Sequence, residues 1–158
     1  MSARLRADQL RQIAIQLRLP ALRDVVRSPM VSEALRLTVA YAEAPRRPPD
    51  QVATLMMGHT DVWQEVHYLL PDLPPAPREP FPMRRYRELK RALFQAGLDR
   101  LDDQPVKSQG RDLWLLERAS AHYHRDLVLV PGEASDVHLK LVEAVRQYWP
   151  EALQELQR

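Results

Sequence analysis

The chain of 158 residues has no cysteine and only four glycines. Without cysteine it can form no disulfide, no thiolate metal site and no cysteine nucleophile. It also has no glycine-rich phosphate loop, no Gly-x-Ser-x-Gly elbow and no His-Glu-x-x-His pair. Because these motifs mark common nucleotide-binding and hydrolytic sites, their absence favours a binding protein and leaves an enzyme as the alternative.

Long apolar runs are also missing, and none approaches the roughly 20 residues that a membrane-spanning helix needs. The first residues, MSARLRADQL, carry charges where a signal peptide has an apolar segment. Hydrophobic residues make up 45% of the chain and charged residues 28%, which is typical of a globular protein. With the lack of cysteine, these features predict a cytoplasmic protein without a membrane partner.

Lysine is scarce, since only three of the 23 basic residues are lysines and the rest are arginines. The formal net charge is +2 and the isoelectric point is about 9.1. Arginine binds phosphate through two parallel hydrogen bonds and stacks on bases, so the bias is compatible with nucleic-acid binding. The codons of a GC-rich bacterial genome would produce the same bias, so composition alone does not establish a function.

The fold class predicted from apolar spacing is α+β and mostly helical. Residues 1–70 are predicted to form an N-terminal unit, a bundle of about four short helices. The first helix has Leu10, Ile13 and Leu17 on one face and ends before Pro20. N-cap residues followed by apolar stripes indicate three further helices: 32–41, 50–57 and 60–69.

A proline-rich connector follows at residues 71–82, where six of the twelve residues are prolines. Proline lacks the backbone donor that helices and central strands need, so this segment is predicted to be extended. Residues 83–158 are predicted to form a C-terminal unit of helix, β-hairpin and helix, with the hairpin in the apolar runs RDLWLLER and RDLVLVP. This order of elements is similar to that of a winged helix.

The helix at 84–91 has a basic face, which gives the leading functional prediction. We expect a small binding protein that associates with nucleic acid through this helix and the hairpin. Seven residues would contact phosphates: Arg84, Arg85, Arg87, Lys90, Arg91, Arg118 and Arg125. The apolar face of the helix consists of Tyr86, Leu89, Leu93 and Phe94. The basic face also fits a second interpretation, the solvated side of an amphipathic helix with local ion pairs.

A cluster of histidines and acids on the hairpin gives an alternative function. Alternation along a strand places His122, His124 and Asp126 on one face, within reach of Glu117 on the partner strand. Imidazole and carboxylate groups bind divalent metals, so these four residues would suit a metal-dependent hydrolase or nuclease. No other cofactor is expected, and His-x-His also occurs in ordinary turns.

Tryptophans and methionines give a third alternative, a structural subunit. Trp63, Met56 and Met57 lie close together in the sequence, Trp114 and Trp149 follow later, and such residues are common on adaptable binding surfaces. A protein partner or a second copy of the chain would then cover them. The same residues are equally natural material for a core between the two halves of the chain.

Overall fold

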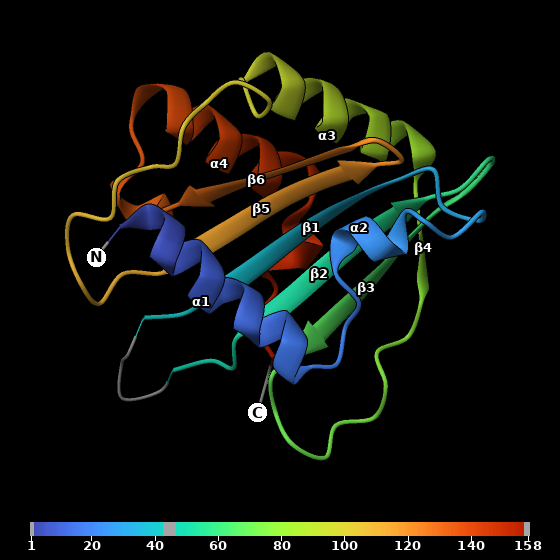
Figure 1. Ribbon diagram of the computed structural model, residues 1–158, viewed down its shortest axis with the longest axis horizontal. Helices are drawn as coiled ribbons and strands as arrows, with labels where there is room; N and C mark the ends of the chain where they lie inside the picture. Colours follow the sequence, from blue (N-terminus) through green and yellow to red (C-terminus); the bar gives the residue numbers. More distant parts are fainter. Residues whose placement is uncertain (1, 43–46, 157–158) are drawn as a thin grey trace.

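The protein forms a six-stranded antiparallel sheet with helices on both faces (Figure 1). The computed structural model describes residues 2–42 and 47–156. The strands lie in the order β4-β3-β2-β1-β5-β6. Their bounds are Glu33–Ala40 for β1, Gln51–Met57 for β2, Val62–Tyr68 for β3, Glu79–Phe81 for β4, Leu113–Ser120 for β5 and Tyr123–Leu129 for β6.

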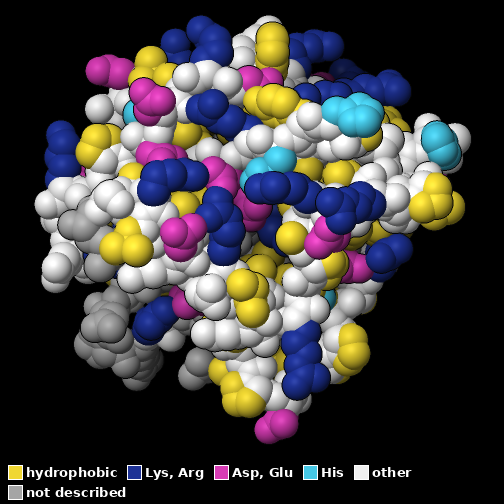
Figure 2. All heavy atoms as spheres, in the orientation of Figure 1, with side chains coloured by type: hydrophobic (Ala, Val, Ile, Leu, Met, Phe, Trp, Pro, Cys, Tyr) yellow, Lys and Arg dark blue, Asp and Glu magenta, His cyan; other side chains and the backbone are white. Residues whose placement is uncertain are grey.

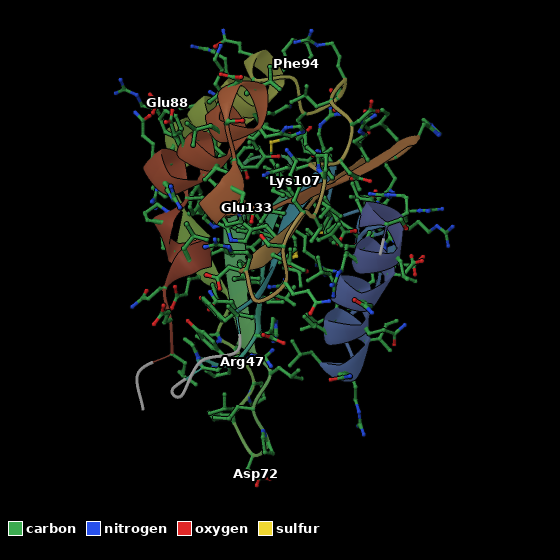
Figure 3. All side chains as sticks on the ribbon, turned by 90° about the vertical axis from the view of Figure 1, so that its left-hand side faces the viewer. Arg47, Asp72, Glu88, Phe94, Lys107 and Glu133 are labelled. Carbon is green, nitrogen blue, oxygen red and sulfur yellow. The ribbon has the colours of Figure 1, made fainter. Side chains whose placement is uncertain are left out.

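Within the described residues, four α-helices cover the two faces of the sheet. They are α1 (Ala3–Gln16), α2 (Leu22–Val25), α3 (Met83–Gln95) and α4 (Asp136–Tyr148), with short 3₁₀ helices η1 (Pro131–Glu133) and η2 (Pro150–Leu153) on either side of α4. The side view shows α1 on one side of the sheet and α3 and α4 on the other (Figure 3). None of these helices, which are those of the described residues, is long and apolar enough to cross a membrane.

The largest part of the core lies between the sheet and the pair α3 and α4. Leu35, Leu37 and Val39 of β1 point to this side and join a cluster with Leu89 of α3 and Leu141 of α4. Two smaller apolar clusters lie on the other face, one under α1 and one under α2. The central strands are therefore buried on both faces, which explains their nearly continuous apolar sequences.

The prediction of a mostly helical N-terminal bundle is wrong, because residues 33–40, 51–57 and 62–68 form β1, β2 and β3. Leu35 and Val39 are four residues apart, which fits a helix, but Leu35, Leu37 and Val39 also alternate, which fits a strand. The polar residues between them, Arg36 and Thr38, are only 3% and 0% exposed. A helix with one apolar face would leave such residues in solvent, whereas a strand between two layers of helices buries both faces.

The predicted order of helix, hairpin and helix in residues 83–158 is confirmed by α3, the β5–β6 hairpin and α4. The similarity to a winged helix is wrong, because β5 pairs with β1 over its whole length. A wing projects into solvent, whereas Leu115, Leu116 and Leu127 are at most 1% exposed. The hairpin is therefore part of the main sheet.

The proline-rich segment at 71–82 contributes only the short strand β4. This strand pairs with β3 at the edge of the sheet, with Pro80 opposite Trp63. An edge strand tolerates proline because one of its sides makes no ladder hydrogen bonds. Since β1 of the first 70 residues pairs with β5 of the last 76, one sheet crosses both predicted units.

Several of the residues considered for a partner surface belong to the core. Met56, Trp114 and Trp149 are at most 5% exposed. Trp63 is half-buried, and the guanidinium of Arg78 lies 5.2 Å from the centre of its ring. Packing inside the chain therefore accounts for most of this set.

Candidate functional site

The helix α3 carries a narrow buried stripe with arginines beside it. Tyr86, Leu89 and Leu93 are each no more than 1% exposed and pack on the sheet. Arg87 and Arg91 lie one turn apart and are exposed. Neither makes an ion pair with any residue that the structure describes. Their guanidinium groups are therefore available to an anion from solution.

Two other arginines of α3 are held by carboxylates. Arg85 donates hydrogen bonds of 2.6 and 2.8 Å to Glu151, and its guanidinium carbon lies 4.2 Å from the centre of the Phe81 ring. Arg84 lies 3.4 Å from Glu88, one turn further along the helix. Arg85 therefore ties α3 to η2, whereas the side chain of Arg84 is 91% exposed and projects into solvent.

Glu33, at the start of β1, fixes the position of α3 on the sheet. Its carboxylate accepts a hydrogen bond of 2.6 Å from the Tyr86 hydroxyl, and it lies 2.7 Å from Lys90 Nζ. Burial raises the pKa of Tyr86, and the hydrogen bond to Glu33 raises it further. These contacts set the rotation of α3 and turn Lys90 toward the same side as β1.

The hairpin contributes one basic side chain to this region. Arg118 of β5 lies 3.2 Å from Asp99, and its guanidinium carbon lies 4.8 Å from the centre of the Tyr123 ring. The Tyr123 hydroxyl also donates a hydrogen bond to Asp99, at 3.0 Å. Arg125 instead donates to the backbone carbonyl of Leu101. Arg118 is therefore positioned beside α3, and Arg125 is occupied by the loop.

A pocket of about 270 Å³ lies between α3, β1 and β5, and we call it the α3 pocket. Its apolar walls come from Leu35, Leu93, Phe94 and Leu98. One carboxylate, that of Asp99, and four basic side chains complete it: Arg87, Lys90, Arg91 and Arg118. Phe94 is 67% exposed and lies at the outer end of α3 (Figure 3). An aromatic ring, four cations and one carboxylate thus surround a small apolar hollow.

The structure brings together four of the seven residues predicted to contact nucleic acid. Arg84, Arg85 and Arg125 lie outside the α3 pocket. Phe94 is exposed, although the sequence places it on the apolar face of the helix. The signal that could have found it is the helical period, because a residue directly after Leu93 is rotated by about 100° from the buried stripe.

Three of the four predicted metal ligands share one face of the sheet. Glu117 and Asp126 are register partners across β5 and β6, and His124 Nε2 lies 3.3 Å from Glu117. His122 lies in the exposed turn before β6, and Asp126 accepts a hydrogen bond of 2.7 Å from Arg4. Within residues 2–42 and 47–156, no three histidines or acids are grouped closely enough to hold a metal ion. The arrangement is one of ion pairs and hydrogen bonds.

Comparison with known proteins gives no family for this chain. No family model matches the sequence, and no curated protein matches it. Its function is therefore argued from the side chains of the α3 pocket and from the charges around them.

Proposed function

We propose that the protein binds single-stranded nucleic acid at the α3 pocket. In this proposal Arg87, Arg91 and Arg118 contact phosphates, and one base stacks on Phe94 or enters the apolar hollow. The observation that carries the proposal is the convergence of four cations and an exposed aromatic ring on one pocket. Basic grooves with stacking aromatics are the usual means of binding single strands.

A single strand fits this pocket better than a duplex does. The bases of a duplex are stacked on one another, so their faces are not available to Phe94 or to the hollow. The volume of about 270 Å³ lies just below the roughly 300–1,000 Å³ typical of small-molecule sites, and it suits one planar group. Because α3 lies flat on the sheet through Tyr86 and Leu89, it is also poorly placed to enter a groove.

The proposal includes a cytoplasmic location, which the sequence features predict and where nucleic acid is accessible.

Support for nucleic-acid binding comes from the charge of the pocket as well as from its shape. Arg87 and Arg91 have no carboxylate partner among the described residues, so their phosphate contacts would not require an internal ion pair to break, whereas Arg118 would contact phosphate beside Asp99. We expect affinity to depend strongly on salt, because phosphate contacts release counterions.

The test is fluorescence anisotropy with a labelled oligothymidine of about 15 nucleotides, which lies within the range of single-strand site sizes. The variant Arg87→Ala/Arg91→Ala should bind at least about tenfold more weakly. Its slope of log affinity against log salt should fall by about 1.4, since each phosphate contact on a single strand contributes about 0.7. Phe94→Ala should weaken binding by about 1–3 kcal/mol through lost stacking.

The matched control is Arg84→Ala, which removes an exposed arginine from the same helix but outside the pocket. We expect its affinity to stay within twofold of that of the wild type. A loss in the control equal to that in Arg87→Ala/Arg91→Ala would show unspecific attraction to α3 and contradict the proposal. Absence of binding by the wild type at low salt would contradict it as well.

A further inference from the structure

A row of polar side chains crosses the face of the sheet that α1 and α2 cover. The strand register aligns Glu65, Thr54, Arg36, Glu117 and Asp126 on neighbouring strands from β3 to β6. Polar residues at the centre of a sheet, between two layers, are costly unless they are partnered. The burial of the residue at the centre of this row, Arg36, is therefore costly for folding unless its polar groups are partnered.

Arg36 is the central member of the row and is only 3% exposed. Its Nε donates to Thr54 Oγ1 at 3.0 Å, and its Nη1 donates to the backbone carbonyl of Pro20 at 2.8 Å. Its other Nη atom has no hydrogen-bond partner among the described residues, and no carboxylate of those residues lies within 4.0 Å of the guanidinium. Burial lowers the pKa of Arg36, and the charges of Glu117 and Glu65 only partly oppose this. Two hydrogen bonds thus fix the guanidinium in place, and no nearby carboxylate of the described residues neutralises its charge.

A cleft of about 360 Å³ lies beside Arg36, between α1, α2 and the sheet, and we call it the α1–α2 cleft. Arg36, Glu117 and His124 line it from the sheet, and Ile15 of α1 and Arg23 of α2 line it from the helices. A neighbouring hollow of about 480 Å³ shares Arg11, Arg23 and His124 with it. Figure 2 shows this face, where a band of Lys and Arg side chains with acids and histidine among them crosses between α1 and α2.

The other charges at the α1–α2 cleft are already paired. Arg11 is held by Asp8, at 2.7 Å, and by Asp126. Arg27 lies 3.0 Å from Asp24. None of these ion pairs includes the guanidinium of Arg36.

Apart from these ion pairs, the cleft contains the cations Arg23 and Arg36 and the hydrogen-bonded pair of Glu117 and His124. Arg23 is exposed and makes no ion pair within the described part of the chain. Glu117 is occupied by the hydrogen bond of 3.3 Å to His124. The cleft therefore holds two guanidinium groups, those of Arg36 and Arg23, that form no ion pair with a carboxylate of the described residues.

We infer that the α1–α2 cleft binds a phosphate monoester, with its dianionic head group between Arg36 and Arg23. A phosphate monoester carries a charge of about −1.5 to −2 at neutral pH and presents three acceptor oxygens, which matches two guanidinium groups. Arginine is the residue of choice for such groups because its planar fork binds two oxygens at once. The volume of the cleft falls in the range of small-molecule sites, and Ala14, Ile15 and Leu19 supply an apolar wall for the organic part.

The experiment is a calorimetric titration of the full chain with ribose 5-phosphate, inorganic phosphate, sulfate and acetate. We expect ribose 5-phosphate to bind most tightly and acetate most weakly, because acetate carries one charge and two oxygens. Arg23→Ala should weaken binding of ribose 5-phosphate about tenfold, and Arg36→Met should abolish it. Arg23 is exposed, so Arg23→Ala remains a valid test even if Arg36→Met does not fold.

The control is Arg146→Ala, which removes the same charge from an exposed position of α4, on the opposite face of the sheet. Its affinity for ribose 5-phosphate should equal that of the wild type. Equal weakening in Arg146→Ala and Arg23→Ala would overturn the inference, since it would show attraction by net charge alone. Binding of acetate or sulfate as tight as that of ribose 5-phosphate would overturn the assignment to a phosphate monoester, and so would the absence of binding.

This site is independent of the α3 pocket, and the two proposals fail separately. Arg87→Ala/Arg91→Ala should bind ribose 5-phosphate as the wild type does. Arg23→Ala should bind the oligonucleotide as the wild type does. Loss of both ligands in either variant would contradict the existence of two separate sites.

Discussion

Arg36 and Glu117 are register partners across β1 and β5 and are 3% and 6% exposed, yet no ion pair of 4.0 Å or less joins these two described residues. Arg36 instead donates to Thr54 and Pro20, and Glu117 contacts His124. Two buried opposite charges are thus held apart on one face of the sheet. Such an arrangement is a poor source of stability, because the cost of burying charge is recovered only through close pairing.

The first prediction concerns the stability contributed by Arg36. Arg36→Met should lower the free energy of unfolding by about 1–3 kcal/mol, because it leaves the Thr54 hydroxyl and the Pro20 carbonyl buried without a donor. Urea unfolding followed by circular dichroism measures this. A loss above about 5 kcal/mol would show a structural ion pair with Glu117 and contradict the separation of the two charges.

The two histidines of the hairpin should differ in their effect on stability. His124→Ala removes the hydrogen bond to Glu117, so a buried carboxylate loses its partner, at a cost of about 1–3 kcal/mol. His122→Ala changes an exposed turn and should stay within about 0.5 kcal/mol of the wild type. Thermal unfolding of both variants with and without zinc or manganese is the measurement. A rise in Tm with metal that disappears in both variants would instead support the predicted metal site.

Tyr86 should make the stability of the protein sensitive to alkaline pH. Burial and the bond to Glu33 raise the pKa of Tyr86 in the folded protein, so above about pH 10 the unfolded chain loses this proton first. The stability from Tyr86 is therefore fully present below about pH 10 and declines as the pH rises above it. The wild type should lose stability above pH 10 more steeply than Tyr86→Phe, as measured by urea unfolding at a series of pH values. Parallel pH profiles would contradict this.

Arg85 and Arg87, two residues apart on α3, should separate stability from binding. Arg85→Ala should lower the free energy of unfolding by about 1 kcal/mol, through the pair with Glu151 and the contact with Phe81. It should leave oligonucleotide affinity unchanged. Arg87→Ala should weaken the affinity and leave stability unchanged, because no described residue pairs with it. Chemical unfolding and anisotropy on both variants are the measurements. Weaker oligonucleotide binding by Arg85→Ala with unchanged binding by Arg87→Ala would contradict this prediction.

The sequence allows good prediction of elements that have a single periodicity. The helices α1, α3 and α4 each have one apolar stripe, and the β5–β6 hairpin has two β-rich runs around a short turn. The strands β1 to β3 are wrongly predicted as helices because both of their faces are buried, so apolar residues occur at helical and at strand spacings alike. Arg36, for example, fits the solvated face of an amphipathic helix, and the sequence alone does not reveal that α1 and α2 cover it.

The candidate site could be predicted only in part, for a similar reason. The basic face of α3 is visible in the sequence, and it does supply Arg87, Lys90 and Arg91 to the α3 pocket. The partners that remove Arg85 and Arg125 from it, Glu151 and the carbonyl of Leu101, lie far away in the chain. Only the fold determines which charges are satisfied.

The most direct test of the proposed function is a comparison of single-stranded and duplex DNA of equal length over a salt series. Anisotropy should show tighter binding of the single strand by at least about tenfold, with a linear fall of log affinity against log salt. This difference should disappear in Phe94→Ala, because that side chain provides the stacking that only an unpaired base can use. Equal or tighter binding of the duplex, or a single-strand preference that survives in Phe94→Ala, would contradict the account.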